Sequence, residues 1–204
     1  MLYYTQLFLF LFLYIPLRIL IGKYKVMIDD ESELESKPLI IVMNHNSRID
    51  PLLLLLLPFR VVKKIAPIKF MTAKYYFRIW WLRMIIQPFG AYPLKKTAWT
   101  FEDYFTDSLH ILSKGGNILI FPEGKVVNPK NKKEVRPGIG FVVSKSELPV
   151  LPVRIAGSET ITVKNFLSKR IVLILHIGKL FKADKKTTDY TNTSATILNR
   201  IYSL

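Results

Sequence analysis

The stretch VMNHNSRIDPLLLLLL, Val42–Leu57, decides how this chain folds and where its polar chemistry lies. Apolar residues over Leu39–Met43 predict a buried strand, and the leucine run that begins at Leu52 predicts a helix packed against it. Between them stand a histidine, two asparagines, an arginine and an aspartate. Polar groups at such a junction cost free energy unless hydrogen bonds satisfy them or a ligand uses them. The junction is therefore either a satisfied turn or a site.

Two members of this stretch, His45 and Asp50, allow both interpretations. On one ideal helix their five-residue spacing would point them about 140° apart, so they meet only if the chain turns between them. Asp50 followed by Pro51 is also typical of a helix start, with the aspartate as N-cap. A lone histidine is most often a hydrogen-bonded core residue. A carboxylate held at a turn can also orient an imidazole, and histidine exchanges protons near neutral pH. The pair is therefore a candidate general base with its orienting group.

Composition narrows the classes of function. The 204 residues are 50% hydrophobic, enough for one domain with a core. The formal net charge of +15 favours a polyanionic partner, either nucleic acid or an anionic membrane. The chain has no cysteine, which excludes disulfides, thiol nucleophiles and cysteine-ligated metals. With only three histidines, we also predict no metal site. His110 and His176 fall in a predicted helix and strand, and we interpret both as structural.

The N-terminal segment Leu2–Ile21 favours the membrane. It carries one charge, Arg18, and as a helix it would be about 30 Å long, the thickness of a hydrocarbon core. A cleaved signal peptide fits less well, because no positive charge precedes the apolar run and no small-residue cleavage site follows it. We predict a membrane anchor over residues 1–26 and a catalytic domain over 27–204.

Two geometries of this anchor stay open. Gln6 and Pro16 interrupt the apolar segment, and its tyrosines suit a membrane interface, so the helix either spans the bilayer or lies half-embedded. If it spans, Lys23 and Lys25 predict that the catalytic part lies on the cytoplasmic side.

Apolar runs that alternate with helical stretches predict an α/β fold: a single sandwich with a largely parallel sheet flanked by helices. The expected strands are Leu39–Met43, Ile68–Thr72, Ile86–Leu94, Asn117–Phe121, Val150–Ile155 and Ile171–Ile177. The expected helices are Pro51–Leu57, Lys74–Met84, Ala98–Ser113, Gly138–Ser146 and one near Ser194–Tyr202. The acidic segment Asp29–Pro38 is expected to be an exposed linker, and Asn128–Pro137 a basic surface loop.

Four blocks of this sequence, and a lysine-bearing segment between the first two, resemble one family in the same order. The segment NHNSRIDP resembles the HxxxxD block of the glycerolipid acyltransferases, the family that contains 1-acylglycerol-3-phosphate acyltransferase. FMTAKYYF resembles its lysine-bearing segment, GAYPLKK its second block, FPEGKVV its third and LPVLPVRI its proline-centred fourth. The match covers roughly residues 37–157, and four ordered blocks are far more specific than any single one.

The resemblance implies acyl transfer from a thioester donor, acyl-CoA or acyl carrier protein, to the free hydroxyl of 1-acylglycerol-3-phosphate, which gives phosphatidate. It implies that His45 is the general base, that Asp50 orients it, and that no covalent enzyme intermediate forms. No cofactor is expected beyond the donor substrate. The expected partners are membrane lipids, the lysophospholipid acceptor and the acyl donor.

The resemblance also implies an acceptor site. Glu123 and Gly124 are expected in the acceptor-binding turn, with Lys74 and Lys96 near the phosphate. The family usually has Thr-Arg after FPEG, whereas this chain has Lys125 and Val126 there. Lys125 is expected to supply the lost charge without the planar fork of arginine. Arg136 is a second candidate, or else a solvated loop charge.

The sequence leaves other functions open. The alternative acceptors are glycerol-3-phosphate and other lysophospholipids, and the non-enzymatic alternative is a membrane protein that binds lipid without turnover. Nucleic acid is not expected as a partner, because the chain has an apolar anchor and no recognition motif. The segment Ala73–Ile86 mixes aromatic and basic residues, and we interpret it as a membrane-interface helix rather than a core helix.

Overall fold

The computed structural model describes residues 1–21, 23–35, 38–95, 100–127, 134–162, 164–165, 171–183 and 188–204. In this part of the chain seven strands form one sheet, in the order β1-β7-β6-β2-β5-β3-β4. The strands are β1 (Lys23–Ile28), β2 (Ile40–Met43), β3 (Ile68–Thr72), β4 (Ala91–Pro93), β5 (Asn117–Ile120), β6 (Val150–Ala156) and β7 (Val172–Ile177). All neighbours pair in parallel except β6 and β7. The predicted largely parallel α/β fold is confirmed.

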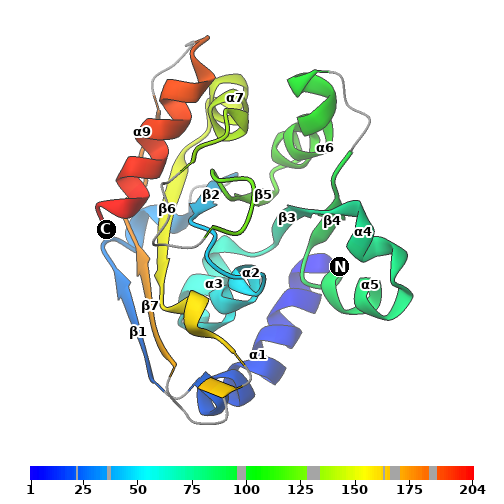
Figure 1. Cartoon of the computed structure of the whole chain (residues 1–204), viewed down its shortest axis with the longest axis vertical. Coiled ribbons are helices and arrows are strands. Elements are labelled where there is room, and N and C mark those ends of the chain that lie inside the picture. The colour runs from blue at the N-terminus through cyan, green and yellow to red at the C-terminus, as the bar shows by residue number, and fades with distance from the viewer. Residues whose placement is uncertain are drawn as a thin grey trace.

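Helices cover both faces of the sheet (Figure 1). One face carries α1 (Leu2–Ile21), α2 (Asp50–Leu53), the 3₁₀ turn η2 (Leu54–Leu56), α3 (Phe59–Ile65), α4 (Lys74–Arg78) and α5 (Trp80–Ile86). The other carries α6 (Phe101–Ser113), α7 (Gly138–Ser146) and α9 (Tyr190–Tyr202). Two further 3₁₀ turns are η1 (Ser32–Glu35) and η3 (Ser158–Thr160). Strand β2 is buried throughout, because Ile41 and Met43 face the first layer while Ile40 and Val42 face the second.

Three features differ from the predicted elements. The strand predicted over Ile86–Leu94 is confirmed only for Ala91–Pro93, which is β4: α5 ends at Ile86, and a turn closed at Gly90 (φ +98°) separates α5 from β4. The helix predicted over Lys74–Met84 is broken at Ile79, whose backbone is extended. Two elements, β1 and α3, were not predicted at all.

The acidic segment Asp29–Pro38 was predicted to be an exposed linker, but part of it packs against the domain. Within it η1 buries Leu34 completely, and Glu31 accepts three hydrogen bonds from the guanidinium of Arg60 in α3, at 2.8–3.0 Å. Through these contacts the segment holds α3 in place against the sheet.

Helix α1 is docked on the domain through one polar side chain in its first turns. The amide of Gln6 accepts a hydrogen bond from the Ile68 N–H at 2.9 Å and donates to the Ile68 and Phe89 carbonyls at 2.6 and 3.1 Å. One turn further on, Phe10 is fully buried and packs on Phe59 of α3. The residue that interrupts the apolar run in the sequence is thus the one that attaches it to the sheet.

Candidate active site

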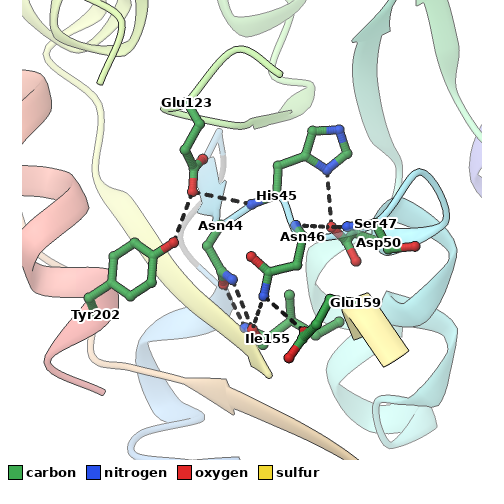
Figure 2. A network of polar contacts seen from close by, with 9 residues as sticks. All are labelled: Asn44, His45, Asn46, Ser47, Asp50, Glu123, Ile155, Glu159 and Tyr202. Carbon is green, nitrogen blue, oxygen red and sulfur yellow. Dashed lines mark hydrogen bonds and ion pairs between the residues drawn. The ribbon is translucent and has the colours of Figure 1, made fainter. Parts of the chain in front are cut away.

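The turn between β2 and α2 brings His45 and Asp50 together, as the first motif predicts. His45 Nδ1 lies 3.0 Å from Asp50 Oδ2, and Figure 2 shows the second ring nitrogen on the far side from the carboxylate. The Asp50 side chain is fully buried, whereas that of His45 is 16% exposed. In the part of the chain that the structure describes, no hydrogen-bond partner lies at His45 Nε2. The imidazole is therefore held on one side and accessible on the other.

Asp50 organises this turn rather than capping the helix. Its Oδ2 accepts hydrogen bonds from the backbone N–H groups of Asn46 and Ser47, both at 2.7 Å. The residue before it, Ile49, stands at the N-cap position, and no side chain caps α2. The expectation that Asp50 is the N-cap is wrong, because its carboxylate faces back into the turn. Pro51 does lie in the first helical turn, as expected.

The two asparagines fix the turn against β6. Asn44 pairs with the backbone of Ile155, accepting from its N–H at 2.7 Å and donating to its carbonyl at 2.8 Å. Asn46 Nδ2 donates to the same carbonyl at 3.3 Å and to Glu159 at 3.4 Å (Figure 2). These contacts attach the end of β2 to the end of its neighbour, so both asparagines have a structural role, while Asn46 Oδ1 is buried and accepts no hydrogen bond from the described residues.

The FPEG segment that follows β5 holds the turn from the other side. The His45 N–H donates to Glu123 Oε1 at 3.3 Å, and the His45 carbonyl accepts from the Val127 N–H at 2.8 Å. The Phe121 ring stacks on the imidazole, with centroids 4.0 Å apart and planes 22° from parallel. The first and third sequence blocks therefore form one structural unit around the histidine.

Glu123 is fully buried, and burial raises the pKa of its carboxyl above the usual range. Its Oε1 also accepts a hydrogen bond from the Tyr202 hydroxyl of α9 at 3.3 Å (Figure 2). Burial first, and then the neighbouring Glu123, raises the pKa of Tyr202 to about 12, so the phenol stays a neutral donor. Sequence reasoning missed Tyr202, which lies 79 residues from Glu123 and carries no local motif.

Gly124 needs its glycine for two reasons. Its φ of +64° is left-handed, and a Cβ there would lie 3.0 Å from the Cγ of Arg136. The Arg136 N–H donates to the Pro122 carbonyl at 2.8 Å, so this arginine is attached to the same turn. Its side chain is exposed. Lys125 forms an exposed ion pair with Glu134 at 2.7 Å.

The remaining predicted cations are less close to the turn. Lys74 is exposed and begins α4 just after the carboxyl end of β3, two strands away from β2 in the sheet. Lys96 lies outside the described residues. Among the residues that are described, no group of three or more histidine, aspartate or glutamate side chains is placed to hold a metal ion.

Comparison with known proteins defines the class. Residues 25–156 match the family model described as Acyltransferase, so this chain belongs to the acyltransferase family. The family resemblance drawn from the four sequence blocks is confirmed. The chain is 27% identical over 135 residues to a probable 1-acyl-sn-glycerol-3-phosphate acyltransferase of Mycoplasma pneumoniae. That match covers 66% of this chain and spans about half the length of the relative, 50%.

A solved structure shares the fold. The crystal structure of PlsC, the 1-acyl-sn-glycerophosphate acyltransferase of Thermotoga maritima, superposes with a TM-score of 0.69 at 18% sequence identity. The superposition covers 97% of this chain and 77% of that one. At this level of identity the likeness establishes the architecture alone.

Proposed function

We propose that this protein transfers an acyl chain from a thioester donor to the free hydroxyl of 1-acylglycerol-3-phosphate and so makes phosphatidate. The observation that carries the proposal is the His45–Asp50 pair, with Nδ1 held at 3.0 Å by a buried carboxylate and the opposite nitrogen accessible. A base oriented in this way is suited to remove a proton from a hydroxyl.

In the proposed step, His45 Nε2 takes the proton of the acceptor hydroxyl while the oxygen attacks the thioester carbonyl carbon. The tetrahedral intermediate then breaks its C–S bond, and the imidazolium returns the proton to the departing thiolate. The products are the ester and a free thiol, with no acyl-enzyme. Asp50 keeps Nδ1 protonated and stabilises the imidazolium that forms. The donor is either acyl-CoA or acyl carrier protein.

The acceptor assignment draws on the name of the Mycoplasma pneumoniae relative and on the cations beside the turn. Arg136 is attached to the FPEG turn through Pro122 and keeps an exposed guanidinium, which suits a phosphomonoester. Its attachment makes it a better substitute for the family's usual arginine than Lys125, which is paired with Glu134. Lys74 stands at the same edge of the sheet and is proposed to add charge. Lys96 stays a prediction.

The same turn suggests a second role for Glu123. The sequence resemblance places it against the acceptor, whereas its buried carboxylate binds the His45 N–H and the Tyr202 hydroxyl. We propose that Glu123 contributes to the reaction by holding His45 in position. We also propose that the lack of a side chain at Gly124 leaves room for the side chain of Arg136.

We also propose that the protein is membrane-associated. In the described part of the chain, α1 is the one helix long and apolar enough to cross a membrane, judged by length and composition. The cytoplasmic orientation inferred from Lys23 and Lys25 stays a prediction.

The test is thiol release from long-chain acyl-CoA by the purified protein in detergent, with lysophosphatidate, glycerol-3-phosphate and lysophosphatidylcholine in parallel. We expect release with lysophosphatidate and a loss of about 10²–10⁴-fold in His45→Ala, the range that a general base contributes. The variant should remain folded, because alanine keeps the His45 backbone N–H and carbonyl that bind Glu123 and Val127.

Each other outcome has a clear reading. Release with a different acceptor keeps the chemistry and reassigns the head group. Silence with all three acceptors moves the test to acyl carrier protein as donor, and silence there too would favour a lipid-binding protein without turnover. Full activity in folded His45→Ala would overturn the mechanism.

A further inference from the structure

Acidic residues are absent from two long segments of the chain. Residues 1–28 and 51–101 contain twelve of the 30 lysines and arginines and none of the 15 acidic residues. These segments supply α1, α3, α4 and α5 and α2 from Pro51 on, the helices of one face of the sheet, together with the edge strands β1 and β4 and the strand β3 beside β4 (Figure 1). Arg60, Lys64 and Lys95 pair with acidic residues from other segments, and the remaining cations leave an excess of positive charge on these segments.

The hairpin of α4 and α5 is apolar and yet almost unburied. None of the residues of these two helices is buried. Five large side chains are 50–73% exposed: Tyr75, Trp80, Trp81, Met84 and Ile85. Exposed apolar clusters of this kind mark sites of interaction rather than ordinary surface. The cations Lys74, Arg78 and Arg83 interleave with them and form no ion pair within the described residues.

Helix α1 adds a second exposed apolar strip. Its inner side is docked through Gln6 and Phe10. Its outer side exposes six apolar residues by 60–74%: Tyr4, Phe8, Leu11, Phe12, Ile15 and Ile19. Helix α1 packs along η2 and α3 instead of leaving the domain. A helix docked in this way cannot cross a bilayer at right angles unless the domain enters the bilayer with it.

The two exposed strips are neighbours. The hydrogen bond from Gln6 to the Phe89 carbonyl joins the first turns of α1 to the turn that directly follows α5. Figure 1 shows the N-terminus beside α5. We call the exposed residues of α1 and of the α4–α5 hairpin, with the hairpin cations, the α1–α5 face.

We propose that the α1–α5 face is a docking surface for an anionic phospholipid bilayer, in which α1 lies flat in the interface and Trp80 and Trp81 enter the headgroup layer. Apolar side chains interleaved with cations fit this occupant, because tryptophan favours headgroup depth and lysine and arginine bind anionic lipid. A second copy of the chain fits less well, since it would oppose the same positive charge. The proposal goes beyond membrane association by assigning the α4–α5 hairpin to it and by excluding a spanning helix.

Docking of this face also orients the candidate active site. Lys74 begins the hairpin at the carboxyl end of β3, and the His45 turn follows the carboxyl end of β2 in the same parallel part of the sheet. A bilayer held by the hairpin would therefore lie near the edge that carries the base.

The first test is binding of the full chain to vesicles of phosphatidylcholine alone or of equal parts phosphatidylcholine and phosphatidylglycerol. We expect tighter binding to the anionic vesicles, weakened by salt. Arg78→Gln with Arg83→Gln should weaken anionic binding about 25-fold, because each cation near such a surface contributes about 1 kcal/mol, or about fivefold. The matched control is Lys179→Gln with Lys182→Gln, two exposed lysines outside the face, and it should bind as the unaltered chain does.

The apolar part is tested by Trp80→Ser with Trp81→Ser against Val172→Ser, an exposed apolar control on β7. The tryptophan variant should lose binding to both vesicle types, and the control should not. Since no acyl donor is present, failure of the proposed chemistry would leave these results unchanged. Equal binding by all variants, or lipid-independent dimers that these substitutions abolish, would overturn the proposal.

The orientation of α1 has its own test, because the chain has no cysteine. Tyr4→Cys, Phe12→Cys and Ile19→Cys each place one fluorophore on the exposed side of α1, and lipid-borne quenchers then report its depth. A flat helix gives similar, shallow depths at all three positions. A deep central label between two shallow ends would show a spanning helix and overturn the proposal.

Discussion

At the scale of single residues, the polar side chains after β2 have two kinds of role: some hold the turn in place, and one is the candidate base. Asn44 and Asn46 bind the end of β6, and Asp50 binds two backbone N–H groups and the imidazole. His45 keeps Nε2 on the side away from Asp50, and Arg48 is exposed to solvent. The residue types could be read from the sequence, but their separate roles depend on a strand more than a hundred residues away.

Asp50→Asn tests whether the carboxylate serves both the turn and the base. Hydrogen bonds to a charged group contribute about 1.5–3 kcal/mol each, so losing the charge should lower the free energy of unfolding by about 1–3 kcal/mol. Turnover should fall by about 10²–10⁴-fold as the imidazole loses its orienting partner. Denaturant unfolding and thiol release measure the two effects. Ser47→Ala is the matched control, because it keeps the backbone N–H that Asp50 binds. Normal turnover in Asp50→Asn would contradict the proposed role.

Glu123→Gln should change how stability depends on pH. Burial raises the pKa of Glu123 in the folded protein, so this group stabilises the fold below its unfolded pKa, and that contribution is lost as pH rises through the folded pKa. Glutamine does not ionise. The melting temperature of Glu123→Gln relative to the unaltered protein should therefore increase as pH rises above about 4.5 toward 8.

Tyr202→Phe should change the pH dependence of stability in the direction opposite to Glu123→Gln. The Tyr202 hydroxyl hydrogen-bonds to the carboxylate and lowers the Glu123 pKa, so its removal should make the loss of stability with rising pH steeper. If both variants differ from the unaltered protein by an amount that does not change with pH, Glu123 is not the group responsible.

At the scale of elements, the helices and strands that could be predicted are those with a clear pattern in the local sequence. Strand β3 and helix α7 have the predicted bounds, because each is a compact apolar run between clear breaks. Strand β1 carries alternating lysines, and its pairing partner β7 comes almost 150 residues later. Helix α3 is held by Glu31 from a segment expected to be solvated. Contacts with residues distant in the sequence cannot be predicted from the local sequence.

The docking of α1 makes a prediction about Gln6. Gln6→Leu keeps the size of the side chain and removes three hydrogen bonds, which leaves the Ile68 N–H and the carbonyls of Ile68 and Phe89 without that partner. A buried polar group left unsatisfied costs about 1–3 kcal/mol, so the melting temperature should fall and backbone amides of β3 should exchange faster. Thr5→Val is the control, because the Thr5 hydroxyl donates to the Met1 carbonyl and not to the sheet. An unchanged melting temperature would show that α1 is not docked in solution.

At the scale of the whole molecule, the candidate site is assembled from distant parts of the chain. The turn after β2, the FPEG turn after β5, the end of β6 and the last turn of α9 meet around His45. Ordered sequence blocks predicted the first two, because each carries polar residues at a strand end. The strand order and the reach of Tyr202 follow from how the layers close, which no single block encodes.

The packing of α1 in the core bears on whether this helix is a separable membrane anchor. Phe10 and Ile21 of this helix are buried in the same core cluster as β2 and α3. Burial of each such side chain contributes about 1.5–3 kcal/mol, so the pair supplies a large share of a typical total of 5–15 kcal/mol. A chain that begins at residue 22 should therefore melt about 10 °C lower or more, since 1 kcal/mol shifts the melting temperature of a domain this size by about 2–4 °C. It should also expose apolar core to solvent and aggregate. Thermal unfolding of the truncated and full chains under one detergent condition measures the difference, with Phe12→Ser, on the exposed side of α1, as the control. A truncated chain that is as stable and active as the full one would mean that α1 serves only as an anchor and that the domain begins after it.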